Sequence, residues 1–341
     1  MHVGLNLVRP IALDDLDALL DLARGAGAGF TSLPPDRDVL RSQIERSLHS
    51  FSAAVREPGH ERYLFVLHDV ATGAVGGCCA VEAACGLDEP FYSYRLGLTV
   101  QASRKFAVYK QVPTLFLTND YTGASVLCSL CLRPEFRAGG AGRLLSRCRF
   151  LFMAMFPQRF ATRVIAEMRG VSDEHGRSPF WEGLGRHFFS VDYAEAERIV
   201  GLGNKSFIAE LMPAHPIYTV LLPQEARDAL GKVHTQTEPA LHLLQAEGFR
   251  HQGYVDIFDG GPTLEAAHAD IRSIRKSSRQ EIRVRTTAPT GVPHLICNTQ
   301  LEGFRCTLVP LAPTDGRVVL DQATATTLNM APFDSARVVA L

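Results

Sequence analysis

The sequence predicts an α+β protein in which a mixed β-sheet is flanked by helices and followed by a small β-rich C-terminal subdomain. Two patterns lead to this prediction. The chain begins with segments in the order strand, helix, helix, strand, strand, each with the matching hydrophobic periodicity. From about residue 275 it consists instead of short β-rich runs that proline and glycine interrupt. A chain of 341 residues with 46% hydrophobic residues can build a large core.

Charge and hydropathy exclude several classes of function. Lys and Arg number 35 and Asp and Glu 36, so no net positive field favours nucleic acid and no tail of one sign favours a membrane surface. The N-terminus lacks the basic start and apolar core of a signal peptide, and no apolar run reaches the roughly 18 residues of a membrane span. We therefore expect a cytoplasmic protein that binds neither nucleic acid nor membrane.

The elements before residue 120 follow from periodicity and turn residues. Asp14 is expected to cap the first helix, and Leu40, Ile44 and Leu48 line one side of the second. The polar, proline-containing link over 29–35 is a region where we expect substrate contacts. The predicted elements are a strand over 4–9, a helix from Asp14, a helix over 37–50, a hairpin of strands over 62–69 and 74–83, and an insertion of strands and loops over 86–119.

The stretch from Ser125 to Phe156 combines an apolar strand over 126–132, a glycine-rich turn and a long apolar helix. This order directs backbone N–H groups and the positive end of a helix at one spot, which suits a phosphate or pyrophosphate. The segment has no lysine, which excludes a P-loop, and its glycines at 139, 140 and 142 do not form G-x-G-x-x-G. Taken alone, an ordinary strand–helix turn explains the segment equally well.

What the turn does match is R-x-x-G-x-G, with Arg137, Gly140 and Gly142. This pattern resembles the pyrophosphate loop of the acyl-coenzyme A N-acyltransferases of the GNAT type. The order of the preceding elements is also that of the GNAT fold, which favours the functional interpretation of the loop over the ordinary turn.

Among the eight cysteines only Cys128 and Cys131 have a spacing typical of metal or redox sites. Both lie within the apolar strand, and the sequence has no second Cys-x-x-Cys pair that could complete a metal site. Buried free thiols are therefore the better explanation. We expect no metal.

The elements after residue 160 include a strand with an unusual carboxylate. Glu167 has apolar neighbours on both sides, and an unpaired buried carboxylate is costly, so we expect it either to pair with an arginine or to lie at a cleft. The basic stretch 275–280 predicts a linker, which divides the chain into an acyltransferase domain (1–275) and the β-rich subdomain (276–341). A second, partial acyltransferase-like unit over 190–275 is left open. The predicted elements are a strand over 163–168, a helix over 179–189, a helix that Thr237 caps, a strand over 254–262, and β-rich runs from 281 onward.

Long strings of this sequence resemble the arginine N-succinyltransferase family, whose paired, related subunits act on arginine and ornithine. The resemblance is strong over about 4–278 and weak in the tail. The strings that carry it are TSLPPD (31–36), PFYSYRLG (90–97), NDYTG (119–123), VIAEMRG (164–170), SPFWEGLGRHFF (178–189), FIAELMPAHPIY (207–218) and YVDIFDGGPTLEA (254–266).

The resemblance implies transfer of a succinyl group from succinyl-coenzyme A to the α-amino group of L-arginine. It implies that the donor is held by the strand at Leu130 and Leu132 and by the loop residues Arg137, Gly140 and Gly142. It also implies a proton-transfer role for His234, in Gly-Lys-Val-His (231–234). An imidazole titrates near neutral pH and so suits that role. Without the resemblance, the simpler interpretation of His234 is a loop histidine that helps to cap the following helix. His187 is the alternative catalytic candidate.

The acceptor needs acidic groups for its guanidinium and a cation for a carboxylate. Arg169 is a candidate for a carboxylate of either substrate. The acidic candidates are Glu167, Asp173, Glu174, Asp256 and Asp259.

Two alternatives to an arginine-specific enzyme stay open. The chain could prefer ornithine, or it could be a regulatory subunit that needs a paralogue for activity. Retention of Arg137, Gly140, Gly142 and His234 favours the enzyme. We expect either a homo-oligomer or a hetero-oligomer with a paralogous subunit.

Overall fold

The computed structural model describes residues 5–26, 30–52, 54–201, 206–213, 215–288 and 290–341. Its strands are β1 (Asn6–Pro10), β2 (Arg62–Asp69), β3 (Val75–Glu82), β4 (Ser93–Ser103), β5 (Val108–Thr118), β6 (Ser125–Leu132), β7 (Arg163–Glu167), β8 (Ile217–Tyr218), β9 (Arg250–Val255), β10 (Pro262–Ala267), β11 (Ser278–Arg285), β12 (Val292–Cys297), β13 (Cys306–Leu311), β14 (Arg317–Asp321) and β15 (Ser335–Ala340). They form one mixed, 15-stranded sheet in the order β14-β11-β15-β12-β13-β1-β2-β3-β6-β7-β10-β9-β4-β5-β8.

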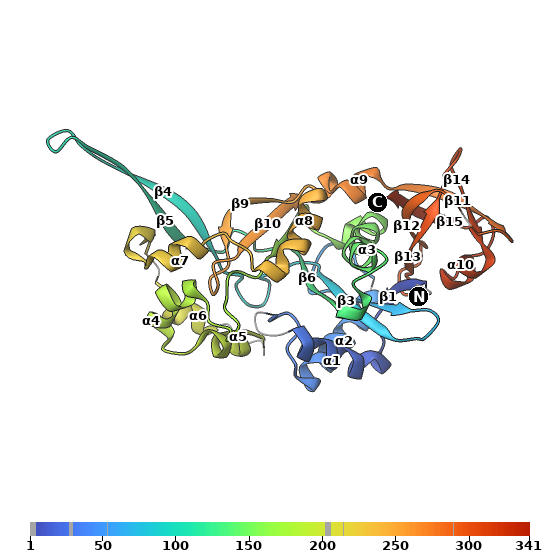
Figure 1. Cartoon of the computed structure of the whole chain (residues 1–341), viewed down its shortest axis with the longest axis horizontal. Coiled ribbons are helices and arrows are strands. Elements are labelled where there is room, and N and C mark those ends of the chain that lie inside the picture. The colour runs from blue at the N-terminus through green and yellow to red at the C-terminus, as the bar shows by residue number, and fades with distance from the viewer. Residues whose placement is uncertain (1–4, 27–29, 53, 202–205, 214, 289) are drawn as a thin grey trace.

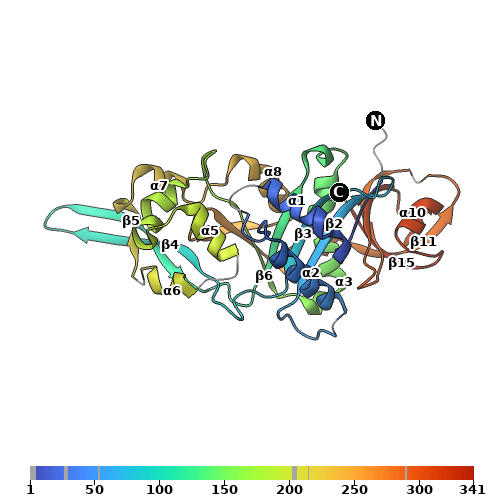
Figure 2. The ribbon, with the colours of Figure 1, turned by 90° about the horizontal axis from the view of Figure 1, so that it is seen from below.

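Helices cover both faces of the central strands (Figure 1). The helices are α1 (Leu16–Ala26), α2 (Arg37–Ser52), α3 (Ala141–Met155), α4 (Arg186–Phe189), α5 (Tyr193–Gly201), α6 (Ser206–Leu211), α7 (Gln224–Ala229), α8 (Glu238–Ala246), α9 (Arg272–Lys276) and α10 (Gln322–Thr327). α1 and α2 lie on one face of β2 and β3, and α3 lies on the opposite face (Figures 1 and 2). α3 is buried around most of its circumference because it packs both on the sheet and against the C-terminal strands.

The C-terminal strands continue the central sheet instead of forming a detached layer. β13 pairs with β1, with Leu7 opposite Thr307, and the Thr307 hydroxyl donates to the Asn6 carbonyl at 2.6 Å. Phe304 enters the main core, where its ring centroid lies 5.1 Å from that of Phe152 on α3. The division at 275/276 and the second unit over 190–275 stay predictions.

At the other end of the sheet, β4 and β5 form a hairpin that projects from the body as a long arm (Figures 1 and 2). Near its base, strands β5 and β9 pack on a second core that contains Leu115, Val255 and the buried indole of Trp181. Trp181 begins a π-helical turn (Trp181–Gly185) that leads into α4, where the sequence predicts a short helix.

Three local predictions are wrong, and a fourth holds only in part: Thr237 is the N-cap residue of α8, but its side chain makes no capping hydrogen bond. Asp14 does not cap the first helix, because the chain enters α1 through a 3-10 turn in which the Asp15 carboxylate accepts the Ala12 N–H at 2.8 Å. The stretch 275–280 is not a linker, because α9 runs to Lys276 and β11 pairs with β15 from Ser278 onward. The third error, the strand over 254–262, concerns the site itself and is described below.

Candidate active site

A cavity of about 640 Å³ opens where the neighbouring strands β6 and β7 diverge. These parallel strands pair at Ser125 with Val164 and at Val126 with Ile165, and beyond these pairs they separate. Residues 126–133 line one wall of the cavity, and residues 166–169 line the opposite wall. The edge of β6 beyond Val126 therefore presents backbone groups to the cavity, where an extended ligand can pair with them as an added strand does.

A β-bulge interrupts β6 at Ser129. The pairing register with β3 shifts between the pairs Cys78–Cys131 and Ala80–Cys128, and Ser129 adopts φ +53°, a region that non-glycine residues rarely enter. Two hydrogen bonds hold this conformation: the Ser129 hydroxyl donates to the Ser32 carbonyl at 3.1 Å and accepts from the buried Arg62 Nη2 at 2.8 Å. The bulge re-aims the strand immediately before Leu130, which lines the cavity.

The glycine-rich turn lies at one rim of this cavity. Gly139 and Gly140 have φ +64° and +85°, which glycine adopts without steric cost, and Gly140 is the N-cap of α3. Arg137 lines the cavity, and the first N–H groups of α3 have no acceptor within the helix. The turn therefore offers a cation and a positive helix end to an anion. A Cβ on Gly142 would meet only Leu132 Cδ2, at 3.8 Å, which leaves room for a ligand.

Acidic side chains gather at another part of the same cavity, where Glu167, Glu197, Asp256 and Asp259 contribute to its lining. The carboxylate of Asp259 accepts N–H groups of Gly170 (2.6 Å) and Gly261 (2.8 Å), so it fastens the turn after β9 to the end of β7. Burial raises the pKa of Asp256, and burial together with repulsion from Asp256 raises the pKa of Asp259 well above its ordinary value. A cationic ligand is the natural partner for such a cluster.

This turn explains the third wrong prediction. β9 ends at Val255 and β10 begins at Pro262, so the predicted strand over 254–262 is interrupted. Asp256 Oδ1 accepts the N–H groups of Phe258 (2.7 Å) and Asp259 (2.9 Å), and Gly260 adopts φ +68°. These local bonds replace the strand ladder and bring both carboxylates to the cavity.

His234 lies half-buried at the entrance to α8, next to Gln236 and Thr237, which line the cavity. Its Nδ1 accepts the Gln236 N–H at 3.2 Å, so the predicted capping role is observed, on the 3-10 turn that precedes α8. This contact places the hydrogen of the neutral ring on Nε2. Burial and the nearby Arg169 lower the pKa of His234, against a smaller opposing effect of the Ser172 backbone.

Comparisons with known proteins agree with this arrangement. Residues 6–273 match the family model described as arginine N-succinyltransferase beta subunit, and residues 280–340 match the model of its C-terminal domain. The chain belongs to the arginine N-succinyltransferase beta subunit family. The arginine N-succinyltransferases of Salmonella paratyphi B and Salmonella typhimurium are each 48% identical over 338 residues, which are 99% of this chain and 98% of theirs. The structure of arginine/ornithine succinyltransferase subunit AI from Pseudomonas aeruginosa superposes with a TM-score of 0.91 at 39% identity and covers 99% of both chains.

The predicted family and the predicted GNAT-type fold class are therefore confirmed, and the chain is an acyltransferase. In the candidate site, the structure brings five predicted residues from the two diverging strands and the turns beside them into one cavity lining. These are Leu130, Leu132, Arg137, Glu167 and Arg169, and Asp256 and Asp259 join them. Part of the link over 29–35 also lines the cavity, through Phe30, Thr31 and Ser32, whereas Gly29 lies outside the described residues.

Other predicted residues lie beside the cavity or away from it. Gly140, Gly142 and His234 are not part of the lining, although Gly142 lies near Leu132 and His234 accepts the Gln236 N–H, and both of these partners line the cavity. Asp173 and Glu174 lie in an exposed turn in which Asp173 pairs with Arg177 at 2.9 Å, so neither is positioned for a substrate in the cavity. His187 is exposed on α4 and is likewise absent from the lining.

Sequence reasoning missed several residues that shape this candidate site, namely Arg62, Ser129, Arg149 and Glu197. Arg62 and Ser129 hold the bulge, and Arg149 and Glu197 line the cavity. Arg149 did carry a signal, because a charged residue followed by Phe150–Met153 within an apolar helix needs a polar partner. Glu197 carried none, since it sits in an ordinary amphipathic helix.

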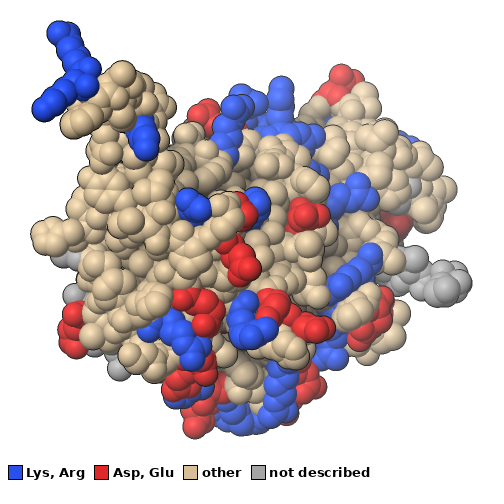
Figure 3. Space-filling model, turned by 60° about the vertical axis from the view of Figure 1, so that its left-hand side comes forward, with Lys and Arg blue, Asp and Glu red and all other residues tan. Residues whose placement is uncertain are grey.

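The part of the chain that the structure describes contains no group of three or more His, Cys, Asp or Glu side chains arranged to hold a metal ion. Within the same residues, no helix combines the length and the apolar character needed to cross a membrane. Charges of both signs are interspersed on the face that Figure 3 shows.

Proposed function

We propose that the chain transfers the succinyl group of succinyl-coenzyme A to the α-amino group of L-arginine and releases N2-succinylarginine and coenzyme A. One observation carries the proposal. A single cavity has Arg137 and the turn before α3 at its rim, an open strand edge along its wall and a carboxylate cluster elsewhere in its lining. These features match the phosphates and the pantetheine arm of the donor and the guanidinium of the acceptor.

The donor would bind along β6. Its pyrophosphate would lie at the N-terminus of α3, near the Arg137 guanidinium, where Gly142 leaves the backbone open to close approach. The amides of the pantetheine arm would pair with the strand edge at Leu130 and Leu132. The bulge at Ser129 would then place the thioester beside the backbone that follows it.

The acceptor would bind across the cavity from β6. Asp256 is the main candidate for the guanidinium, because its Oδ1 serves the turn and its Oδ2 is the second oxygen of a carboxylate that lines the cavity. Glu167, at the end of β7, is a second candidate. Arg169 would meet the α-carboxylate; its Nη2 donates to the Ser172 hydroxyl at 2.9 Å, which orients the guanidinium.

The transfer requires a deprotonated amine and a protonated leaving group. The amine nitrogen attacks the thioester carbonyl, the new C–N bond forms, the C–S bond breaks, and the proton that the amine loses ends on the thiolate of coenzyme A. His234 would carry that proton, after its 3.2 Å contact with the Gln236 N–H is released. A net cost of about 1 kcal/mol is typical of losing such a bond.

Direct transfer is favoured over a cysteine-bound intermediate. Cys128 and Cys131 line the cavity, but burial raises the pKa of both thiols. The thiolate is the reactive form, so these groups are poor nucleophiles at neutral pH.

One assay tests the proposal and its alternatives. The purified chain is incubated with succinyl-coenzyme A and with arginine, ornithine or lysine, and thiol release and the succinylated product are measured. Turnover that is fastest with arginine is expected. Faster turnover with ornithine would move the acceptor assignment to ornithine. No turnover alone, with turnover restored by a co-expressed paralogue, would make the chain a dependent subunit.

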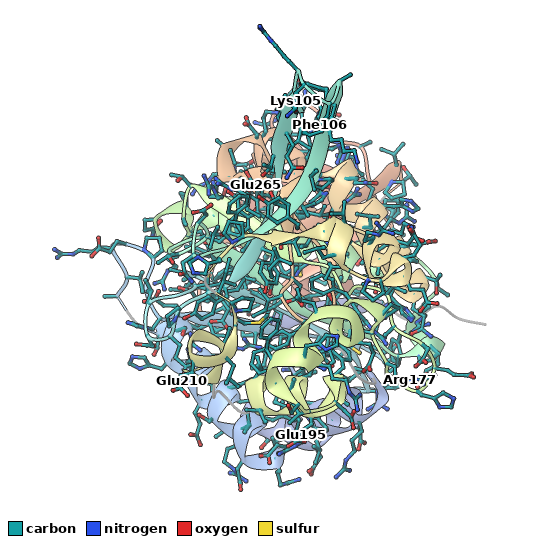
Figure 4. All side chains as sticks on the ribbon, turned by 90° about the vertical axis from the view of Figure 1, so that its left-hand side faces the viewer. Lys105, Phe106, Arg177, Glu195, Glu210 and Glu265 are labelled. Atoms are coloured by element: carbon teal, nitrogen blue, oxygen red, sulfur yellow. The ribbon has the colours of Figure 1, made fainter. Side chains whose placement is uncertain are left out.

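We also propose that the chain forms an oligomer through the β4–β5 arm, with a second copy as partner. The arm exposes large apolar side chains, including Leu98 (56% exposed), Phe106 (71%) and Tyr109 (67%). Figure 4 shows Lys105 and Phe106 at its outer end. An isolated two-stranded hairpin is marginally stable, and exposed apolar surface of this kind is typical of interfaces. A paralogous subunit in place of the second copy is an outcome that the measurement in the Discussion distinguishes.

A further inference from the structure

The side chain of Arg149 is a buried cation that lines the cavity. It lies on α3 and is only 2% exposed. Its Nε donates to the Ser146 carbonyl at 3.0 Å and its Nη2 to the Ser146 hydroxyl at 3.4 Å, so both bonds return to the helix that carries it. Within the described residues, no carboxylate oxygen lies within 4.0 Å of this guanidinium.

The other arginines of α3 show how unusual this is. Arg147 is also buried, but its Nε lies 2.7 Å from Glu247 Oε1, so it has a carboxylate as partner. Arg143 is exposed and needs no partner. Burying a guanidinium without a counter-ion costs several kcal/mol, and five N–H donors are only partly used by Ser146. Arg149 therefore has unused capacity for an anion that enters the cavity.

The position of Arg149 identifies which anion this is. It lies eight residues into α3 after Ala141, about 12 Å along the helix from the end proposed for the pyrophosphate. Cys128 of β6 shares the lining and is close enough for the charge of Arg149 to act on the pKa of its thiol, and β6 is the strand proposed for the donor. Of the acidic cluster, Glu167 ends β7, Glu197 lies on α5, and Asp256 and Asp259 lie in the turn after β9, whereas Arg169 follows β7; these groups are proposed for the acceptor.

We propose that Arg149 binds the free carboxylate of the succinyl group and thereby selects a dicarboxylic acyl donor over a monocarboxylic one. This inference rests on the proposed function, because it names the acyl group of the same donor. The planar guanidinium can hold a carboxylate with two parallel N–H···O bonds, which adds direction to charge. The cavity then has a cation on its donor side for the acyl group and carboxylates on its acceptor side for the guanidinium.

The test compares succinyl-coenzyme A with butyryl-coenzyme A, which has the same chain length and no carboxylate. For the Arg149→Met variant we expect affinity for succinyl-coenzyme A, measured by calorimetry, to fall about 100-fold, as for truncation of one partner of a buried charge pair. Affinities for butyryl-coenzyme A and for free coenzyme A should change less than about threefold. In turnover, the preference of kcat/KM for succinyl over butyryl should fall by the same factor.

Two controls separate this role from a structural one. Arg159→Met removes a buried guanidinium outside the cavity, which donates to the Ser50 carbonyl and the Tyr63 hydroxyl, and should leave the donor preference unchanged. If Arg149→Met fails to fold, Arg149→Lys is measured in its place. Lysine keeps the positive charge but cannot make the two parallel N–H···O bonds of a guanidinium, so the succinyl preference should fall less than in Arg149→Met. An unchanged donor preference in either Arg149 variant would overturn the inference.

A comparison of two acceptors tests the alternative that Arg149 binds the α-carboxylate of the acceptor. Agmatine is arginine without its α-carboxylate, so a variant whose preference for arginine over agmatine falls, while its donor preference holds, would place Arg149 at the acceptor and overturn the inference. The binding measurement needs no turnover. Loss of succinyl discrimination in a chain that transfers nothing to arginine would support the role of Arg149 and contradict the proposed acceptor.

Discussion

The backbone N–H of His234 donates a hydrogen bond of 2.9 Å to the carbonyl oxygen of Arg169. An isolated β-bridge between Gly170 and Val233 extends this contact. The loop before α8 is thereby fastened to the end of β7, the strand whose divergence from β6 opens the cavity. This backbone pairing thus holds the proposed proton carrier and the proposed carboxylate ligand beside each other at that wall, although they are distant in sequence.

Replacement of His234 should separate its capping role from proton transfer. His234→Ala and His234→Asn should both lower kcat by about 10²–10⁴-fold, the usual contribution of a general acid–base group. Asn keeps an oxygen that can accept the Gln236 N–H, so it should preserve the melting temperature. Calorimetry should show nearly unchanged affinity for coenzyme A in both variants. An active His234→Asn enzyme would mean that the residue is only a cap.

The pH dependence of kcat/KM should carry the signature of a histidine with a lowered pKa. The neutral ring is the form that accepts a proton, and burial and Arg169 keep it neutral below its ordinary pKa of 6.5. Activity should therefore hold as the pH falls to 6.5 and decline only below it. A decline centred above 6.5 that persists in His234→Asn would assign the titration to another group.

Two glycine variants should distinguish an effect on the stability of the fold from an effect on donor binding. Gly140→Ala places a Cβ at φ +85° and 2.7 Å from Leu308 Cδ2, so it should destabilise the fold by about 1–2 kcal/mol or more, measured by urea unfolding. Gly142→Ala has space and lies in the first turn of α3, so unfolding should change by at most about 1 kcal/mol, in the stabilising direction. It should nevertheless weaken coenzyme A binding. Unchanged affinity would show that the phosphates lie elsewhere.

Asp256→Asn should reveal the guanidinium partner. The amide oxygen can still accept the N–H groups of Phe258 and Asp259, so the turn should persist. Loss of a charge-assisted bond of about 1.5–3 kcal/mol should lower kcat/KM for arginine roughly 10–150-fold, with little effect on citrulline, its uncharged analogue. Asp173→Asn, in the exposed turn, is the matched control and should behave as wild type. Equal losses for arginine and citrulline would remove Asp256 from this role.

The arm prediction concerns molar mass in solution. Light scattering after size-exclusion chromatography should give an oligomer for the purified chain and a smaller species for the double variant Phe106→Ser, Tyr109→Ser. Val292→Ser removes an equally exposed apolar side chain (61%) from the C-terminal strands and should leave the mass unchanged. A monomeric wild type that becomes larger only with a paralogue would assign the arm to a hetero-oligomer.

Local patterns sufficed for much of the fold. The hairpin over 62–69 and 74–83 and the helix from Arg37 match β2, β3 and α2 closely, because alternation and four-residue spacing are local properties. Side-chain bonds decided where the patterns failed: Asp256 turns a strand-like stretch into the wall of a cavity. Arg149 and Glu197 became site residues only through packing of α3 and α5 against distant strands, which no spacing reveals.

The pairing of β1 with both β2 and β13 has a consequence for synthesis of the chain. β1, at Asn6–Pro10, leaves the ribosome well before β13, at Cys306–Leu311. At about 5–20 residues per second, one edge of the catalytic sheet stays without its partner for tens of seconds. An open edge of this kind invites pairing with other chains. Premature termination before Cys306 would therefore leave a sticky nascent protein instead of a smaller enzyme, with Gly140 deprived of the Leu308 side chain that lies against it.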